Sequence, residues 1–277
     1  MSSGDPQQTG KARMAAMTAL WTIIALVYLF PYTWMVLTAF RQPVDTLAMR
    51  FVFTPTLDGF RTIFIDSNFQ LYLQNSLLTA IPTTILVLLL AAPAAYSLAH
   101  LNKRSKLFLG SVLVARMVPG IAILIPLYLA ASRAGLLDRR MTLIVVYCAF
   151  NLPFAVWLLR GFFREIPNEL REAAIVDGCS EFQVFWKIMV PLVGGGLVAT
   201  SVFVFIGAWN EFLFALALTQ SNAATAPLAV IGFRNEYGVQ WGAIGAAAVM
   251  ISTPVVAFAV VMQKYLVRGL TMGAVKG

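Results

Sequence analysis

Long apolar runs with almost no charged side chains limit this fold more than any other feature of the sequence. Crossing the hydrocarbon core of a bilayer takes about 20 mostly apolar residues in a helix, because a helical backbone satisfies its own hydrogen bonds. Over the 277 residues, 60% are hydrophobic and only 12% are charged, whereas soluble domains are about half apolar and about a quarter charged. Composition therefore excludes an ordinary soluble protein or a disordered chain, and predicts an all-α membrane protein.

Six runs are long enough to cross a bilayer, and each is predicted to form one transmembrane helix. They cover about residues 14–40, 73–99, 107–131, 141–159, 192–219 and 241–263. Residues 1–13 are predicted to be a tail and residues 14–277 a single membrane domain. The first run follows Lys11 and Arg13, as in a secretory signal, but it is too long for the apolar part of one and is interpreted as a retained anchor. Small residues from Gly242 to Ala248 permit close helix contact in the last run.

The distribution of Lys and Arg predicts the orientation of the spans. An even number of spans puts both termini on one side, and the tails and loops on that side carry 12 Lys and Arg against 7 in the other loops. The positive-inside rule therefore predicts that both termini are cytoplasmic. Because the net charge of +8 is divided among these loops, it forms no single basic face for nucleic acid.

Few side chains are available for metal binding or catalysis. Cys148, Cys179 and His100 are the only cysteines and histidine, too few for a disulfide framework or a Cys/His metal site. The stretch from Gly4 to Lys11 superficially resembles a phosphate-binding loop, but five residues instead of four separate its glycines, and Ala12 replaces the Ser or Thr that would hold magnesium. We therefore expect no cofactor, metal or catalytic residue in this chain.

The connection between the fourth and fifth runs is predicted to form two short helices around a tight corner. Pro167 suits the first helical position, Gly178 can adopt the left-handed conformation that ends a helix, and Ser180 with Gln183 fits a capping box. Pro191 is predicted to end the second helix.

The second of these helices is predicted to be amphipathic. Its apolar side chains recur with the spacing of one helix face, at Phe182, Phe185, Trp186 and Met189. Such a helix could lie on a membrane or dock in a groove of a partner. Ala173 and Ala174, which are small enough for another surface to approach closely, favour the partner.

The same connection resembles a known motif. The matching residues are Glu172, Ala173, Ala174, Asp177, Gly178, Phe185, Ile188 and Pro191. They resemble the EAA loop of permease subunits in binding-protein-dependent ABC importers. Three residues, Cys179, Val190 and Gly195, differ from those usual in this motif. These differences affect the helix geometry that the resemblance implies where the loop ends.

Further stretches resemble the carbohydrate permeases of the maltose-transporter MalG type. They are Phe30–Trp34, Asn75–Leu77, Ala94–Ala99, Pro126–Tyr128, Leu152–Phe154, Ala208–Phe212 and the tail Gly269–Gly277. The resemblance implies a type I ABC importer permease fold in a bacterial or archaeal inner membrane, with the EAA loop on the cytoplasmic side between spans 4 and 5.

The resemblance also implies partners. It implies a second homologous permease subunit, two ATPase subunits that bind ATP and Mg²⁺, an extracytoplasmic sugar-binding protein and a sugar substrate. The loop would sit in a cleft on the ATPase, residues 220–240 would face the binding protein, and the tail from Thr271 would reach toward the ATPases. A permease for glycerol phosphate or another small polar solute is the alternative within this group.

Polar groups inside the apolar runs are candidates for the sugar path, because leaving them in lipid is costly. They are Arg116, Trp209, Asn210, Glu211 and Asn75. Structural pairing of Arg116 with Glu211 is the competing interpretation, and Asn75 and Asn151 are also suited to hydrogen bonds between helices.

Two other classes of protein remain alternatives. A self-sufficient secondary transporter or channel would be expected to show more spans or internal repeats, together with a coupling-ion site in the membrane. A membrane-embedded enzyme would need a nucleophile and base or metal ligands in a cavity.

Overall fold

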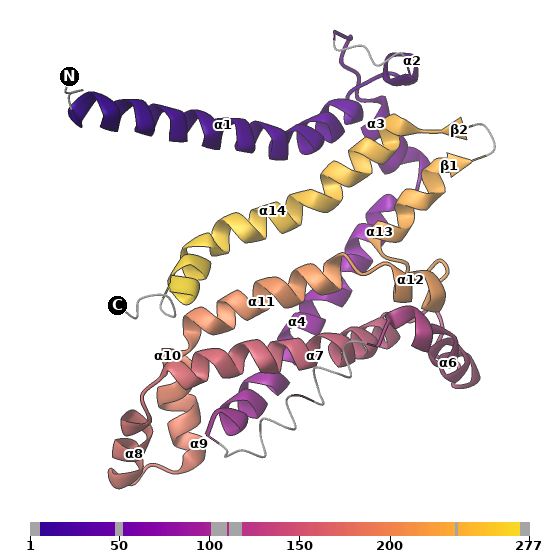
Figure 1. Cartoon of the computed structure of the whole chain (residues 1–277). Helices are drawn as coiled ribbons and strands as arrows, with labels where there is room; N and C mark the ends of the chain where they lie inside the picture. Colours follow the sequence, from indigo (N-terminus) through magenta and orange to yellow (C-terminus); the bar gives the residue numbers. More distant parts are fainter. Residues whose placement is uncertain (1–5, 48–51, 101–109, 111–117, 236–237, 272–277) are drawn as a thin grey trace. The chain divides into compact units, whose positions relative to one another are not determined.

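The computed structural model describes residues 6–47, 52–100, 110, 118–235 and 238–271. The chain divides into two compact units, whose elements are labelled in Figure 1. Unit 1 comprises Met1–Ser67 and Phe233–Met250, and unit 2 comprises Asn68–Gly232 and Ile251–Gly277. Helix α14 (Trp241–Thr271) contributes to both.

Unit 1 consists of one long helix, short helical segments and a small hairpin. Its elements are α1 (Pro6–Ala39), α2 (Pro43–Leu47), α3 (Asp58–Arg61), a π-helical turn (Thr62–Asp66), the antiparallel pair β1 (Arg234–Asn235) and β2 (Gly238–Val239), and the start of α14. Small residues allow the backbones of α1, α3 and the start of α14 to approach one another closely. A Cβ on Gly59 of α3 would lie 2.4 Å from the Gly242 carbonyl oxygen of α14, and one on Gly245 of α14 would lie 2.7 Å from the Ala39 nitrogen of α1.

Unit 2 is a helical bundle in which α4, α7 and α11 lie side by side (Figure 1). Its longer helices are α4 (Phe69–His100), α6 (Gly120–Arg133), α7 (Arg140–Glu165) and α11 (Gly194–Trp209). Its shorter elements are α8 (Asn168–Val176), α9 (Glu181–Val184), a π-helical turn (Phe185–Met189), α10 (Val190–Leu192), α12 (Leu213–Leu218) and α13 (Ala226–Ala229), after which a 3₁₀ turn (Val230–Phe233) leads into unit 1.

The core of unit 2 has two apolar clusters along α4, α7 and α11. One is built around Val87, Leu159, Phe163, Val184 and Met189. The other is built around Leu143, Tyr147, Phe205, Trp209 and Leu218. The first cluster joins the segment α8–α10 to the bundle, because Ala174, Val184, Phe185 and Met189 belong to it.

Four helices within the described ranges are long and apolar enough to cross a membrane. They are Arg13–Ala39, Phe69–His100, Arg140–Glu165 and Trp241–Gln263. A fifth is reached if the pair Glu181–Leu192 and Gly194–Trp209, bent by 76°, is counted as one span. Pro191 and the glycines from Gly194 to Gly196 account for this bend, because proline and glycine are the residues least suited to a continuous helix.

The third predicted run is only partly described. Residues 107–109 and 111–117, including the path candidate Arg116, lie outside the described residues, and α6 covers residues 120–131 of the run before it ends at Arg133. The six-span count therefore stays a prediction.

The fifth predicted run, residues 192–219, differs from a single helix. Helix α11 ends at Trp209 and α12 begins at Leu213. Between them, the Glu211 carboxylate accepts hydrogen bonds from the backbone N–H groups of Phe214 (3.0 Å) and Ala215 (3.3 Å). A side chain that satisfies free N–H groups at a helix start favours a new helix over continuation of the old one.

Candidate functional sites

The corner between α8 and α9 is held by local chemistry. Helix α8 follows Pro167, which stands at the N-cap, one position earlier than predicted. Gly178 has φ +88°, and Asp177 lies beside it at the C-cap. Both hydrogen bonds of the predicted capping box are present, from Gln183 N to Ser180 Oγ (3.3 Å) and from Ser180 N to Gln183 Oε1 (2.9 Å). The direction of the chain is thus defined on both sides of Gly178.

The four apolar side chains predicted to share one face divide between two faces. Phe185 and Met189 are buried against the bundle, whereas Phe182 is 71% exposed and Trp186 46% exposed. The physical reason is the π-helical turn from Phe185 to Met189, whose wider repeat changes which residues lie together. Ile188 packs against the same core, while Pro191 is exposed.

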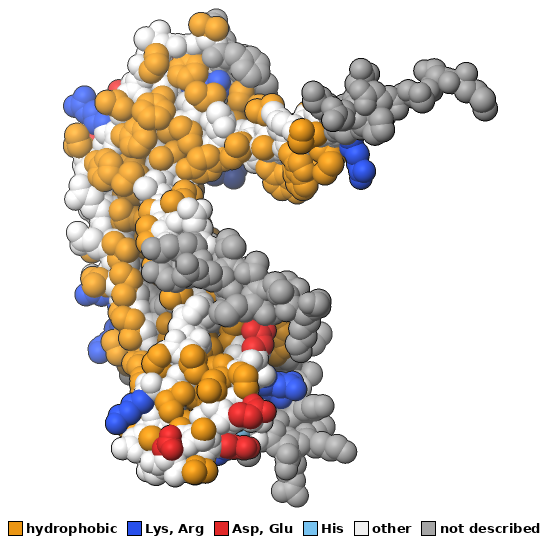
Figure 2. Space-filling model, turned by 90° about the vertical axis from the view of Figure 1, so that its left-hand side faces the viewer, with side chains coloured by type: hydrophobic (Ala, Val, Ile, Leu, Met, Phe, Trp, Pro, Cys, Tyr) orange, Lys and Arg blue, Asp and Glu red, His pale blue; other side chains and the backbone are white. Residues whose placement is uncertain are grey.

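The Glu-Ala-Ala triplet on α8 is also divided. Ala174 is buried and belongs to the core cluster, whereas Glu172 and Ala173 are exposed. Asp177 is exposed at the corner. Acidic side chains gather at the lower end of the face in Figure 2, the level at which α8 and α9 lie in Figure 1.

Exposed apolar side chains accompany those charges. They are Leu170, Ile175, Val176, Phe182 and Trp186. A surface that combines exposed apolar and acidic side chains is typical of a contact with another protein. The small side chain of Ala173 lets such a protein approach α8 closely.

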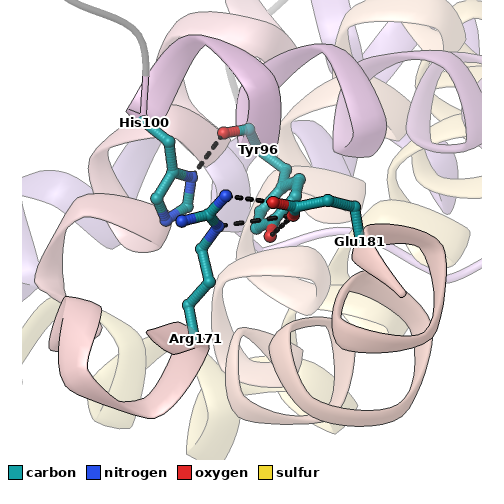
Figure 3. Close-up of polar contacts among 4 residues, drawn as sticks. All are labelled: Tyr96, His100, Arg171 and Glu181. Carbon is teal, nitrogen blue, oxygen red and sulfur yellow. Dashed lines mark hydrogen bonds and ion pairs between the residues drawn. The ribbon is translucent and has the colours of Figure 1, made fainter. Parts of the chain in front are cut away.

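A polar cluster joins the corner to the end of α4, and we call Tyr96, Arg171 and Glu181 the Glu181 cluster (Figure 3). The Glu181 carboxylate forms an ion pair with Arg171 Nη2 and accepts a hydrogen bond from Arg171 Nε (3.3 Å). It also accepts one from the Tyr96 hydroxyl (3.2 Å). The hydrogen bond with Glu181 raises the pKa of Arg171 above its ordinary value. One carboxylate therefore connects α8, α9 and α4.

Packing fixes the Tyr96 ring. Its centroid lies 5.3 Å from that of Phe185 and 5.6 Å from that of Phe163. His100 lies one turn further along α4, with Nδ1 2.8 Å from the Tyr96 carbonyl oxygen (Figure 3). Sequence reasoning missed this cluster, because no local pattern links residues 85 positions apart.

A second polar cluster lies at the other end of α4, and we call it the Asp138 cluster: Asn75, Ser76, Asp138 and the segment 220–226. Asp138 has φ +56°, which is uncommon for a residue other than glycine. Its carboxylate accepts hydrogen bonds from the backbone N–H groups of four consecutive residues, Gln220 (3.0 Å), Ser221 (3.3 Å), Asn222 (3.0 Å) and Ala223 (3.0 Å). The Asn222 side-chain amide donates a further one (2.9 Å).

The charge of Asp138 is stabilised by these donors. Desolvation by itself would raise the pKa of this carboxyl group, but the four backbone N–H groups outweigh it and lower the pKa to about 2. Sequence reasoning missed this anchor too, although an acidic residue next to a glycine-containing loop is a weak signal for a turn.

Helix α4 holds the same segment from the other side. The Asn75 side-chain amide donates to the carbonyl oxygens of Asn222 (2.8 Å) and Ala224 (3.0 Å), and the Ser76 hydroxyl accepts from the Ala226 N–H (2.8 Å). Asn75 is fully buried. Its observed role is thus to satisfy irregular backbone.

The other path candidates also make defined contacts. The Trp209 ring is 1% exposed, stacks on Phe205, and donates from Nε1 to the Ile251 carbonyl oxygen (3.0 Å). Glu211 caps α12, and Asn210 is exposed at the helix break. Asn151 donates to the Tyr147 carbonyl oxygen of its own helix (2.8 Å). The pairing of Arg116 with Glu211 falls outside the described residues.

Comparison with known proteins identifies the family. The model of the family described as "Binding-protein-dependent transport system inner membrane component" matches residues 88–272. The chain belongs to this family. The resemblance drawn from the corner motif and the MalG-type stretches is thereby confirmed at the level of the family.

Similar proteins match this chain over almost its whole length. The "Probable ABC transporter permease protein y4oR" of Sinorhizobium fredii is 59% identical over 261 residues, 94% of each chain. The "Trehalose transport system permease protein SugB" of Mycobacterium tuberculosis is 38% identical over 274 residues, 97% of this chain and 100% of that one. The "Trehalose/maltose transport system permease protein MalG" of Thermococcus litoralis is 33% identical over 261 residues, 92% of this chain and 94% of the other.

Solved structures share the fold. A chain in the crystal structure of a bacterial ABC transporter involved in the import of the acidic polysaccharide alginate has a TM-score of 0.76 at 21% identity, over 96% of this chain and 100% of its own. A chain in a bacterial alginate ABC transporter, in complex with an alginate pentasaccharide-bound periplasmic protein, has a TM-score of 0.68 at 16% identity, over 92% of this chain and 94% of its own.

Proposed function

We propose that this protein is one permease subunit of an ATP-driven, binding-protein-dependent importer for a sugar, either a di- or oligosaccharide or a polyol. The observation that carries the proposal is the capped corner at α8 and α9, whose exposed side chains include Glu172, Ala173 and Asp177. Relatives named for trehalose, maltose and diacetylchitobiose transport support a sugar as the solute.

The corner is the proposed contact for a cytoplasmic ATPase. Exposed Ala173 lets another surface approach α8, and the exposed apolar groups around it can be buried by that surface. Phe185 and Met189 anchor the corner in the bundle. Closure of the ATPases on ATP would move this corner, and the permease pair would switch between inward-facing and outward-facing states.

The rest of the complex follows from this assignment. The chain would span the inner membrane six times with both termini in the cytoplasm, beside a homologous permease subunit. Two ATPase subunits would bind ATP and Mg²⁺, so this chain itself would not be an enzyme. An extracytoplasmic binding protein would deliver the sugar to the opposite side, where residues 220–240 would lie.

The helix break at Asn210 and Glu211 is the proposed part of the sugar path. Interrupted helices in transporters expose polar backbone and side chains where they line a cavity, and Asn210 is exposed at this break. Trp209 and Asn75 are buried and hydrogen-bonded within unit 2, so their contribution to the path would be to support it. Arg116 is retained as a path candidate from the sequence.

Purification of the complex from its native host, through a tag on this chain, tests the proposal. The expected result is co-purification of a second permease subunit and an ATPase, with ATP hydrolysis stimulated by the binding protein and one sugar among trehalose, maltose and diacetylchitobiose. Stimulation by glycerol 3-phosphate alone would favour the small-solute alternative.

One substitution tests the corner within that complex. We expect Ala173→Arg to abolish stimulated ATP hydrolysis, because a long charged side chain would separate the two surfaces. The matched control is Ala134→Arg, which places the same side chain at another exposed alanine, just after α6. Full stimulation in the Ala173→Arg complex would contradict the proposed contact.

A further inference from the structure

Helix α8 is weakly attached to the bundle. Of its nine residues only Ala174 is buried, and a helix of this length is marginal without tertiary support. At the corner the backbone adds hydrogen bonds from Gly178 N to Ile175 O (3.0 Å) and from Cys179 N to Ala174 O (3.0 Å), which hold the turn itself. A force on the exposed face of α8 would therefore tend to swing it about the corner.

The Arg171 side chain opposes that swing. It lies one turn before Ala174, so both residues are on the inner face of α8, and it reaches Glu181 at the first position of α9. The ion pair thus bridges the corner from one helix to the other. Of these two groups, Arg171 is 28% and Glu181 56% exposed.

The Tyr96 hydroxyl extends the bridge to α4. Its ring is held between Phe163 and Phe185, so the hydroxyl has little freedom to follow Glu181 by itself. A displacement of Glu181 therefore acts on α4. At the other end of α4, about 31 Å away at 1.5 Å for each of the 21 residues that follow Asn75, Asn75 and Ser76 hold the segment 220–226.

We propose that the Glu181 cluster is a mechanical link that makes the α8–α9 corner and α4 move together, so that movement of the corner reaches the segment 220–226 through α4. This inference rests on the proposed function of the corner as the ATPase contact. Tyr96, Arg171 and Glu181 are positioning residues in it, since none needs to touch ATP or sugar.

The test uses the complete complex in proteoliposomes, with ATP hydrolysed and radiolabelled trehalose or maltose imported measured in the same preparation. Tyr96→Phe removes only the hydroxyl, and Glu181→Gln removes only the charge. We expect each variant to retain its ATPase subunits and its hydrolysis, while the number of sugars imported per ATP falls about three- to tenfold.

Matched controls have the same chemical changes outside the cluster. Glu165→Gln removes an exposed acid at the end of α7, before the proposed contact face of α8, whereas Glu181→Gln removes one from α9. Tyr128→Phe removes the hydroxyl of a tyrosine exposed on α6. Both controls should import as many sugars per ATP as the unmodified complex.

Three further variants separate a link from a merely stabilising contact. Because Tyr96 acts through Glu181, the double variant Tyr96→Phe/Glu181→Gln should import as many sugars per ATP as Glu181→Gln alone. Arg171→Lys, which retains a cation, should recover part of the ratio that Arg171→Met loses. Additive losses in the double variant would overturn the proposal.

The remaining outcomes distinguish this inference from the proposed function. If the unmodified complex shows neither an ATPase subunit nor sugar import, the proposed function fails. If Ala173→Arg abolishes stimulation while Glu181→Gln keeps the normal ratio, only the mechanical link is overturned. The link is also overturned if Glu181→Gln lowers Tm and ATPase content while each intact complex keeps its ratio.

Discussion

The two ends of α4 carry polar clusters of opposite character. At the Asn75 end, side chains bind backbone: Asp138, Asn75 and Ser76 satisfy consecutive groups of the segment 220–226. At the His100 end, side chains bind side chains: Tyr96 and Arg171 meet on Glu181 (Figure 3). Asn75 and Ser76 are buried, whereas Glu181 is more than half exposed.

This difference indicates two mechanical roles. Irregular backbone next to a helix bundle needs permanent partners, because a buried N–H or C=O without one costs about 1–3 kcal/mol. The Asp138 cluster supplies those partners and so fixes one conformation. An exposed ion pair contributes only about 0–1 kcal/mol to folding, so the Glu181 cluster joins the corner to α4 while adding little to the stability of the protein.

The largest expected effect is on the Asp138 cluster. Asp138→Asn keeps the size of the side chain and its tolerance of positive φ, but it replaces one acceptor oxygen with a donor that faces N–H groups. We expect the free energy of unfolding to fall by about 3 kcal/mol, measured as a lower Tm in detergent. The control Asp58→Asn alters an exposed acid at the start of α3 and should cost less than about 1 kcal/mol. An unchanged Tm in Asp138→Asn would remove the contrast between the clusters.

Asn75 provides the next effect. Asn75→Ala leaves the carbonyl groups of Asn222 and Ala224 without their donor inside the protein, and we expect a loss of about 2 kcal/mol. In the control Asn151→Ala, the lost bond is to a carbonyl of the same helix, so the loss should be clearly smaller. Denaturant midpoints of the two variants test this order, and equal losses would contradict it.

The pH dependence of stability is a third way to test the comparison. Because folding lowers the Asp138 pKa to about 2, its contribution is fully present above about pH 4 and is lost as pH falls toward 2. Because the hydrogen bonds of Asp138 are partly exposed to water, which screens its charge, we expect this contribution to be about 1 kcal/mol. Tm measured from pH 5 to pH 2 should therefore fall more steeply in the unmodified protein than in Asp138→Asn. Parallel curves would show that Asp138 does not carry this contribution.

The smallest expected effect on stability is at the Glu181 cluster. Glu181→Gln should lower the free energy of unfolding by less than about 1 kcal/mol, because the ion pair is exposed. The loss should shrink further in high salt, which screens exposed charges, whereas the Asp138→Asn loss should change little. Tm measured at low and at 1 M salt tests both statements. A larger, salt-independent loss in Glu181→Gln would show that the two clusters are alike.

Local chemistry was predictable from the sequence. The corner depends on Gly178, Ser180 and Gln183, which act within a few residues of one another, and the structure has both the left-handed glycine and the capping box. The division of the α9 face was not predictable, because apolar spacing implies a uniform helical repeat and the π-helical turn from Phe185 to Met189 changes that repeat.

The break at Asn210 and Glu211 shows another limit of sequence patterns. Hydropathy is nearly continuous across residues 192–219, so composition predicts one helix. In the structure, the Glu211 carboxylate accepts hydrogen bonds from the N–H groups of Phe214 and Ala215. A hydropathy pattern does not record such a contact.

By itself the sequence determined that this chain belongs in a membrane, where its apolar runs lie and how the α8–α9 corner turns. These properties depend on composition and on neighbours in the chain. Only the tertiary structure decided that Tyr96 meets Glu181 and that Asp138 meets Asn222, because these pairs are 85 and 84 residues apart. Helix packing brings such residues together, and no periodicity in the sequence records the contact.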